Sequence, residues 1–259
     1  MIARLSSLIL LCLWPVMPAT AQDVLVLGEV HDNPAHHRLQ ADRVAAFAPA
    51  ALVFEMLTRA QAARITPALR DDPAALAKAL DWTDGGWPDF AMYYPIFAAA
   101  PDARIYGAQV PPAEARAAME KGVATIFGPR APDYGLTRPL PPAEQALREA
   151  LQARAHCGAL PDDVLPAMVQ VQRLRDAALA RAVVRARRET GGPVVVITGN
   201  GHARPDWGVP AVLARLAPEL RVHSVGQGEG GRPPQGRFDE VVISAYVPDR
   251  PDPCAAFAG

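Results

Sequence analysis

Short runs of apolar residues recur along this chain and constrain its fold more than any other feature. They occupy residues 24–27, 51–54, 104–107, 194–197, 222–225 and 241–246. Helical patterns begin at Pro34 and at Trp207, between successive runs. Strands that alternate with helices form parallel sheets, and strands that are apolar throughout are covered on both faces. We therefore predict an α/β protein with a mainly parallel sheet and helices on both sides.

Two long stretches interrupt this alternation, at about residues 58–100 and 112–190. Both are rich in alanine, helical in pattern and broken by prolines. We expect these insertions to form a helical lid over the ends of the strands. The glycine- and proline-rich segment from Gly226 to Gly236 is expected to be a flexible loop, and residues 22–259 suit one large domain.

The N-terminal segment has the layout of a secretory signal peptide. Arg4 precedes an apolar run from Leu5 to Val16, and Ala19-Thr20-Ala21 supplies an A-x-A cleavage site. An uncleaved membrane anchor is the alternative, but a helix that spans a bilayer needs about 20 apolar residues. We expect cleavage after Ala21 and a periplasmic protein. A lipid anchor on Cys12 is not expected, because Leu11 stands where a small residue is required.

The charge and the cysteine content limit which partners and which covalent cross-links are expected. The chain has 26 basic and 27 acidic residues, a net charge of −1, and no block of Lys or Arg. Nucleic acid is therefore not an expected partner. After the signal segment, Cys157 and Cys254 remain. They either form a disulfide in an oxidising compartment or stay as two free thiols, and two cysteines do not decide between these states.

Two G-x-x-H motifs follow predicted strands. Gly28 leads to His31 and Gly199 leads to His202, while Glu29 and Glu55 also stand at strand ends. Glycine permits a sharp turn there, and open α/β sheets bind ligands at the carboxyl ends of their strands. A single G-x-x-H arises by chance, and either glutamate alone is explained by a helix N-terminus. Two matched turns with a strand-end glutamate predict a shared site.

Three kinds of chemistry fit this shared site. His31, His202 and Glu55 form a candidate set of ligands for a divalent metal. In an enzyme, Glu29 together with these three residues supplies a general base and the acid that orients it. The same groups also suit recognition of carboxylates on a bound ligand.

Several segments resemble the ChaN-like haem-binding proteins of the Tiki superfamily. They are LGEVHDNPAHHRLQ, VFEM, WPDFAMYYPIFA, IYGAQVP, AHCGALP, MVQVQRLRDAALA and ITGNGHARPDWGVPAVL, which together span nearly all of the chain after the signal segment. The resemblance implies a three-layer α/β/α core with a helical lid. It also implies haem binding for iron uptake at the bacterial envelope. Some members of that family are lipid-anchored, whereas this chain lacks the lipid-attachment pattern.

The resemblance directs attention to residues that hold haem. Ferric haem accepts a phenolate or an imidazole as its axial ligand. Tyr94 is the leading candidate, followed by Tyr93, Tyr134 and His156. A tyrosine beside a proline, however, usually packs in a core with its hydroxyl hydrogen-bonded.

Two further positions are candidates for polar contacts with haem. His37, next to His36, opens a helix, where it either meets a haem propionate or faces water. Arg175 either faces the site or forms an ordinary solvated pair with Asp176.

Two functional classes therefore stay open. The first is a haem-binding protein without turnover, acting as a homodimer and with the haem-uptake machinery of the envelope. The second is a metal-dependent protease or esterase that uses the paired G-x-x-H motifs and Glu55, as some relatives in the wider superfamily do. A weaker third alternative is a domain that keeps the fold and has lost its activity.

Overall fold

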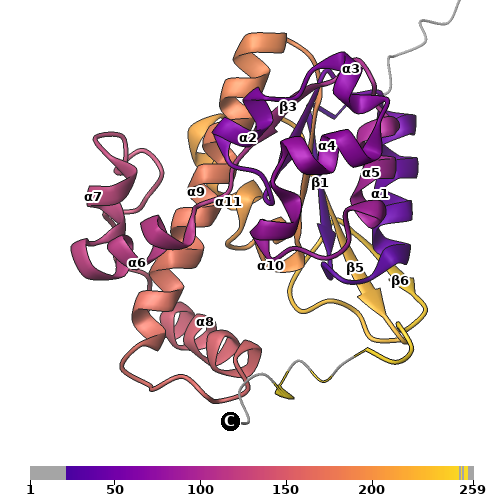
Figure 1. Ribbon diagram of the computed structural model, residues 1–259. Helices are drawn as coiled ribbons and strands as arrows, with labels where there is room; N and C mark the ends of the chain where they lie inside the picture. The colour runs from indigo at the N-terminus through magenta and orange to yellow at the C-terminus, as the bar shows by residue number, and fades with distance from the viewer. Residues whose placement is uncertain (1–21, 251, 253, 256–259) are drawn as a thin grey trace, which may run out of the picture.

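The computed structural model describes residues 22–250, 252, 254 and 255 (Figure 1). The expected signal segment, residues 1–21, lies outside the described residues. Among the described helices, none combines the length and the apolar character needed to cross a bilayer. Six strands form one parallel sheet: β1 (Val24–Glu29), β2 (Ala51–Phe54), β3 (Arg104–Gly107), β4 (Val194–Gly199), β5 (Val222–Glu229) and β6 (Glu240–Ser244).

Helices occupy most of the remaining described chain. The first group is α1 (Pro34–Phe47), α2 (Arg59–Ala63), α3 (Pro67–Arg70), α4 (Pro73–Ala79), the 3-10 helix η1 (Trp82–Gly85) and α5 (Phe90–Ala98). The second group is α6 (Pro112–Lys121), α7 (Val123–Phe127), α8 (Pro142–Ala155), α9 (Leu165–Thr190), α10 (Asn200–Ala203) and α11 (Val209–Leu216).

The strand order is β3-β2-β4-β1-β5-β6, so β4 lies between β1 and β2. Glu29 at the end of β1 pairs in register with Gly199 at the end of β4. The backbone N–H of Glu55, which follows β2, donates to the Ile197 carbonyl of β4 at 3.1 Å. Parallel pairing therefore delivers the carboxyl ends of three neighbouring strands to one edge.

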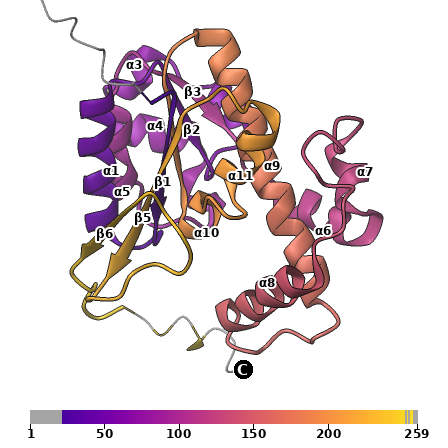
Figure 2. The same ribbon diagram turned by 180° about the vertical axis from the view of Figure 1, so that it is seen from behind.

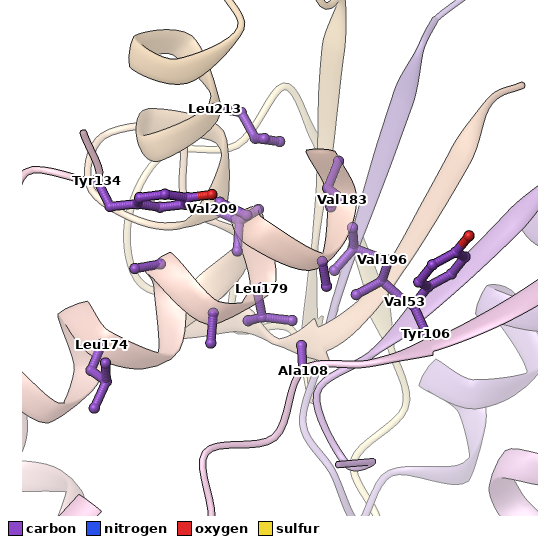
Figure 3. Packing of buried hydrophobic residues seen from close by; sticks show 14 of the residues in the cluster. Val53, Tyr106, Ala108, Tyr134, Leu174, Leu179, Val183, Val196, Val209 and Leu213 are labelled. Atoms are coloured by element: carbon purple, nitrogen blue, oxygen red, sulfur yellow. The ribbon is translucent and has the colours of Figure 1, made fainter. Parts of the chain in front are cut away.

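Strands β1, β2 and β4 are buried on both faces, and their alternate residues serve opposite cores, whereas Val241 and Ile243 of the edge strand β6 are exposed. Val24 and Val26 of β1 pack with α9 and α11, whereas Leu25 and Leu27 pack on the side of α1 and α5. Val53 and Val196 continue the first core against Leu179 and Val183 of α9, as Figure 3 shows. This alternation explains why the strands are apolar throughout.

Helices cover both faces, which confirms the predicted three-layer α/β/α fold. The α1 and α5 helices lie on one face, and α9 and α11 lie on the other (Figure 2). The insertion at 58–100 is more than a lid. Leu76 of α4 and Phe97 of α5 have exposed fractions of 0% and belong to the core on the α1 side.

The expected flexible loop after β5 begins later than the sequence indicates. β5 continues to Glu229, so residues 226–229 are strand rather than loop. A Cβ on Gly228 would lie 2.1 Å from the Arg232 carbonyl oxygen. The glycine therefore serves a close approach of two backbone segments within a strand, and does not mark flexibility.

A disulfide joins Cys157 to Cys254 across a sequence separation of 97 residues. Their Cα atoms are 5.6 Å apart. Cys157 follows the end of α8, and Cys254 lies in the segment after β6. This resolves the alternative left open by the sequence. In the chain-entropy model, a disulfide that closes a loop of this size raises the free energy of unfolding by about 4–5 kcal/mol, because it restricts the unfolded chain.

Candidate functional site

The carboxyl edge of the sheet gathers the four residues of the paired motifs. Glu29 ends β1 and His31 follows it, Glu55 follows β2, and His202 lies in α10 directly after β4. Because β2, β4 and β1 are neighbours, these side chains converge, as the paired motifs predict. They form two histidine–carboxylate pairs, one on each side of β4.

The first pair is built on β1. The His31 Nδ1 lies 2.7 Å from Glu29 Oε1, and the Tyr93 hydroxyl of α5 donates to the same oxygen at 2.7 Å. Gln40 of α1 donates to the other oxygen, also at 2.7 Å. The Glu29 side chain is 0% exposed, whereas that of His31 is 33% exposed. A buried carboxylate is thus fully hydrogen-bonded and orients a partly accessible imidazole.

The second pair lies on the other side of β4. The His202 Nδ1 is 2.7 Å from Asp176 Oδ1 of α9, and its Nε2 is 3.6 Å from Glu55 Oε1. The second oxygen of Glu55 accepts from the Thr198 hydroxyl at 2.7 Å and from the Gly199 N–H at 2.8 Å. His202 therefore sits between two buried carboxylates.

Gly199 keeps the two pairs adjacent. A Cβ at this position would lie 3.0 Å from His31 Nε2 and 3.7 Å from Glu55 Oε2. A Cβ would therefore press on the His31 ring, while it would only touch Glu55 in ordinary van der Waals contact. Because Gly199 has no side chain, the His31 ring of the first G-x-x-H turn can lie directly beside the second turn.

The carboxylates of the site favour charged histidines. Burial opposes the charge on His31, but the hydrogen bond to Glu29 and the charge of Glu55 outweigh it and raise the His31 pKa to about 9. Burial likewise opposes ionisation of Glu55. The positive charges of His202 and His31 nevertheless lower its pKa to about 2.

The pKa values of His202, Asp176 and Tyr93 are also shifted, each in the direction that its surroundings favour. Burial opposes the charged form of His202, but Glu55 and Asp176 raise its pKa above 6.5. Burial raises the pKa of Asp176 as well, and His202 only partly offsets it. Burial also raises the pKa of Tyr93 strongly, and the charge of Glu29 adds to the shift. Tyr93 is therefore a neutral donor.

The metal set predicted from the sequence lies within this cluster. Across the described residues, no group of three or more His, Cys, Asp or Glu side chains has an arrangement that suits a metal ion. The two nearby carboxylates instead have imidazolium partners, which meets their need for positive charge. A metal held by His31, His202 and Glu55 stays a prediction.

A cavity of about 800 Å³ opens beside the second pair. His202 and Asp176 line it, and His31 is not among the lining residues. Its apolar surface comes from both sides of the opening: Val30, Leu151, Ala155, Val169, Trp207, Pro233 and Pro234. This volume lies within the usual range for small-molecule sites, about 300–1,000 Å³.

Arginines gather around this cavity. The guanidinium carbon of Arg204 is 3.4 Å from the centre of the Trp207 ring, and that of Arg148 is 4.8 Å from it. Arg204 is also bound by Asp206, and Arg148 by Glu144. Arg232 lines the cavity from the opposite side, is exposed, and has no ion pair within the described residues. It is therefore a cationic donor available to an anionic group.

The tyrosines expected to hold haem lie outside this cavity. The Tyr94 hydroxyl donates at 2.9 Å to the carbonyl of Arg70, the last residue of α3, and Tyr94 does not line the cavity. Tyr93 is 0% exposed and committed to Glu29. Tyr134 is buried in the core on the α9 side and packs on Phe127. The expectation of Tyr94 as the leading ligand thus lacks the geometry that it needs.

The other expected haem contacts are also displaced from the cavity. His37 is fully buried, and its Nε2 lies 2.8 Å from the His31 carbonyl oxygen, so it braces the first G-x-x-H turn. His156 caps α8, with its Nδ1 2.8 Å from the Gln152 carbonyl oxygen. Arg175 lies beside His202, whose pKa its positive charge lowers slightly, but Arg175 does not line the cavity.

Sequence reasoning left the role of Asp176 open, between a solvated pair with Arg175 and a site-facing position, and it missed Tyr246 and Arg232. Asp176 orients His202, and the pattern of α9 gave a signal: Asp176 lies one turn from Leu179 and two turns from Val183, on a buried stripe. Tyr246 and Arg232 line the cavity from segments after β5 and β6. No local motif marks them.

One solved structure supports the architecture, and two others match with lower TM-scores. A structure described as cofacial haem binding to ChaN of Campylobacter jejuni matches with a TM-score of 0.64 and 18% identity, covering 85% of this chain and 87% of that one. The type III effector HopBA1 matches with a TM-score of 0.46 and 14% identity, covering 86% and 88%. The erythromycin esterase EreC, in an open conformation, matches with a TM-score of 0.42 and 12% identity, covering 83% and 72%.

Sequence comparison identifies the family. No curated protein matches this chain. A family model described as haem-binding uptake, Tiki superfamily, ChaN matches residues 16–213, which is most of the sequence. The chain therefore belongs to the ChaN family of haem-binding uptake proteins in the Tiki superfamily.

Proposed function

We propose that this protein binds haem in the cavity beside His202, as an exported component of haem or iron uptake. The observation that carries this proposal is the lining of the cavity. Apolar walls suit the porphyrin, and Arg232 offers a free cation to a propionate. On the opposite wall, the buried Oε1 of Gln152 in α8 has no hydrogen-bond partner within the described residues and adds a polar contact for a ligand.

Tyr246 is the residue best suited to ligate the iron. It is the only tyrosine among the described residues that line the cavity, and it is 57% exposed. His202 is the alternative imidazole, but both of its ring nitrogens face carboxylates at 2.7 and 3.6 Å. A phenolate is an established protein ligand of ferric haem. The Tyr94 candidate is accordingly replaced by Tyr246.

A haemin titration tests this assignment. The parent protein is expected to give a shifted Soret band that saturates at a fixed stoichiometry. Tyr246→Phe keeps the ring and removes the oxygen, so it should lose the phenolate signature and weaken binding by about tenfold, or 1.4 kcal/mol. Tyr94→Phe is the matched control and should keep the parent spectrum. Absence of binding by the parent protein would overturn the proposal itself.

Export is the second part of the proposal. The signal pattern that ends at Ala21 supports it, as does the Cys157–Cys254 disulfide, since disulfides persist in oxidising compartments. N-terminal sequencing of the periplasmic fraction should give Gln22 as the first residue. An intact Met1 on a membrane-bound product would contradict export. Sizing with and without haemin tests the homodimer, and capture of envelope proteins tests the uptake partner.

A hydrolase is the second candidate, and the histidine–carboxylate pairs favour it. In each pair a buried carboxylate orients an imidazole, which is the arrangement that general acid–base catalysis needs. A panel of small ester and peptide substrates, with and without a chelator, tests both the activity and its dependence on metal. Replacing His31 and His202 together by asparagine should abolish any hydrolysis. Hydrolysis that survives this double change would remove the candidate.

A further inference from the structure

The segment after β6 forms one side of the cavity. Tyr246, two residues beyond the end of β6, lines it together with residues of the β5–β6 connection. From β6, the chain runs toward α8, as both views show (Figures 1 and 2). On the other side of the opening, α8 contributes Leu151 and Gln152. The segment and α8 thus face each other across the cavity.

Two anchors hold the segment that carries Tyr246. The first is Arg250, whose Nη2 donates to Glu229 Oε2 of β5 at 2.9 Å and whose Nε lies 2.9 Å from Asp32 Oδ2. These contacts attach the segment to the sheet. The second anchor is the disulfide from Cys254 to Cys157, which attaches it to the end of α8.

The disulfide therefore connects the two opposite walls of the cavity. The contacts of α8 are chiefly with α9, while those of β6 are with β5. Without the disulfide, α8 would be held mainly by α9, and the segment that carries Tyr246 would be held by β6 and by the contacts of Arg250. With it, the end of α8 and the segment after β6 are covalently joined.

We propose that the Cys157–Cys254 disulfide positions Tyr246 across the mouth of the cavity and thereby sets how long a bound haem is retained. This inference rests on the proposed function for the identity of the ligand. Its structural part, the fixing of residues 245–250 against α8, does not depend on the ligand. A tether that holds the ligating residue in place stabilises the bound state, and such differences between variants of one site appear mostly in the dissociation rate.

Loss of general stability is the competing explanation for any effect of removing the disulfide, since a cross-link of this span stabilises the whole fold. A melting temperature therefore does not test the proposal. The informative measurements are local: amide hydrogen exchange in the protein without haem, and the rate of haem transfer to an excess of apomyoglobin.

The test uses Cys157→Ala with Cys254→Ala, which leaves no free thiol. In the protein without haem, amide exchange at residues 245–250 should rise about tenfold, while β1 and β4 keep their protection. Haem transfer should also be about tenfold faster. Leu76→Ala is the control, because it removes fully buried volume on the other face of the sheet. It should lower stability and change neither readout.

A second comparison asks whether the disulfide acts through Tyr246. In a Tyr246→Phe background, removing the disulfide should change the transfer rate by less than about twofold, because the ligand that it positions is already absent. Equal acceleration in both backgrounds, or in Leu76→Ala, would overturn the positioning role. Unchanged exchange at residues 245–250 would overturn the proposal whether or not haem binds. If the parent protein does not bind haemin but amide exchange is faster in the variant, haem is refuted as the ligand, while the fixing of residues 245–250 by the disulfide is supported.

Discussion

The two G-x-x-H turns share a sequence pattern and differ in what surrounds them. His31 lies beside the Trp87 ring, with 5.1 Å between ring centres, and its carboxylate partner has donors from Tyr93 and Gln40. His202 lines the large cavity and stands between two carboxylates. The turn supplies the imidazole, and the neighbouring helices decide which groups surround it and whether it lines the cavity.

The largest expected difference between the two turns is in stability. His202→Ala should leave buried Asp176 without its hydrogen-bonded imidazole and take the nearest positive charge from Glu55, at a cost of about 3–5 kcal/mol. His31→Ala should cost about 1–2 kcal/mol, because Glu29 keeps two other donors. Urea unfolding of the two variants measures the difference. Equal costs would show that the two turns are energetically equivalent.

Ligand binding should separate the turns next. Trp207→Leu removes the ring beneath Arg148 and Arg204, so haemin affinity should fall about tenfold. Trp87→Leu is the matched change beside His31, and affinity should stay within about twofold. The measurement is a haemin titration of each variant against the parent. A stronger effect at Trp87 would move the ligand to the first turn.

The dependence of stability on pH sharpens the comparison further. The His31 pKa is raised, so its contribution should be fully present below about pH 6.5 and lost as pH rises through about 9. The Glu55 pKa is lowered, so its contribution should be present above about pH 4.5 and lost as pH falls toward 2. Urea unfolding of the parent and of His31→Gln across this range measures both. A difference between them that stays constant from pH 6.5 to 9 would contradict the assigned charge on His31.

The smallest expected effect is at Tyr94, which does not line the large cavity and whose hydroxyl is bonded to Arg70 rather than to a residue of either pair. Tyr94→Phe removes a hydrogen bond to the Arg70 carbonyl and should cost about 0.5–1.5 kcal/mol. Urea unfolding measures that cost. A loss of several kcal/mol would indicate a structural role beyond this single bond.

How much the sequence could predict depends on the range of the interactions. The strands and the two glycine turns are local patterns, so the sheet and the convergence of His31 with His202 followed from them. The partner of His202 is 26 residues away along the chain, on a helix where an acidic residue is ordinarily solvated. Tyr246 enters the cavity through the disposition of a terminal segment, and the strand at Gly228 depends on a backbone contact across the turn. Such relationships are set by tertiary packing, which single-sequence patterns do not carry.

The long helix α9 has a mechanical consequence. Its 26 residues span about 39 Å at 1.5 Å per residue. Val183 and Ala186, in the second half, are fully buried against the sheet, whereas Val169 and Gln172, in the first half, line the cavity. The sheet therefore fixes the second half of α9, whereas the first half lines the cavity, and α8 packs against α9. The disulfide at the end of α8 holds these two helices at a second point. Bending of α9 should therefore be smallest where it packs on the sheet, and its other end should also resist bending.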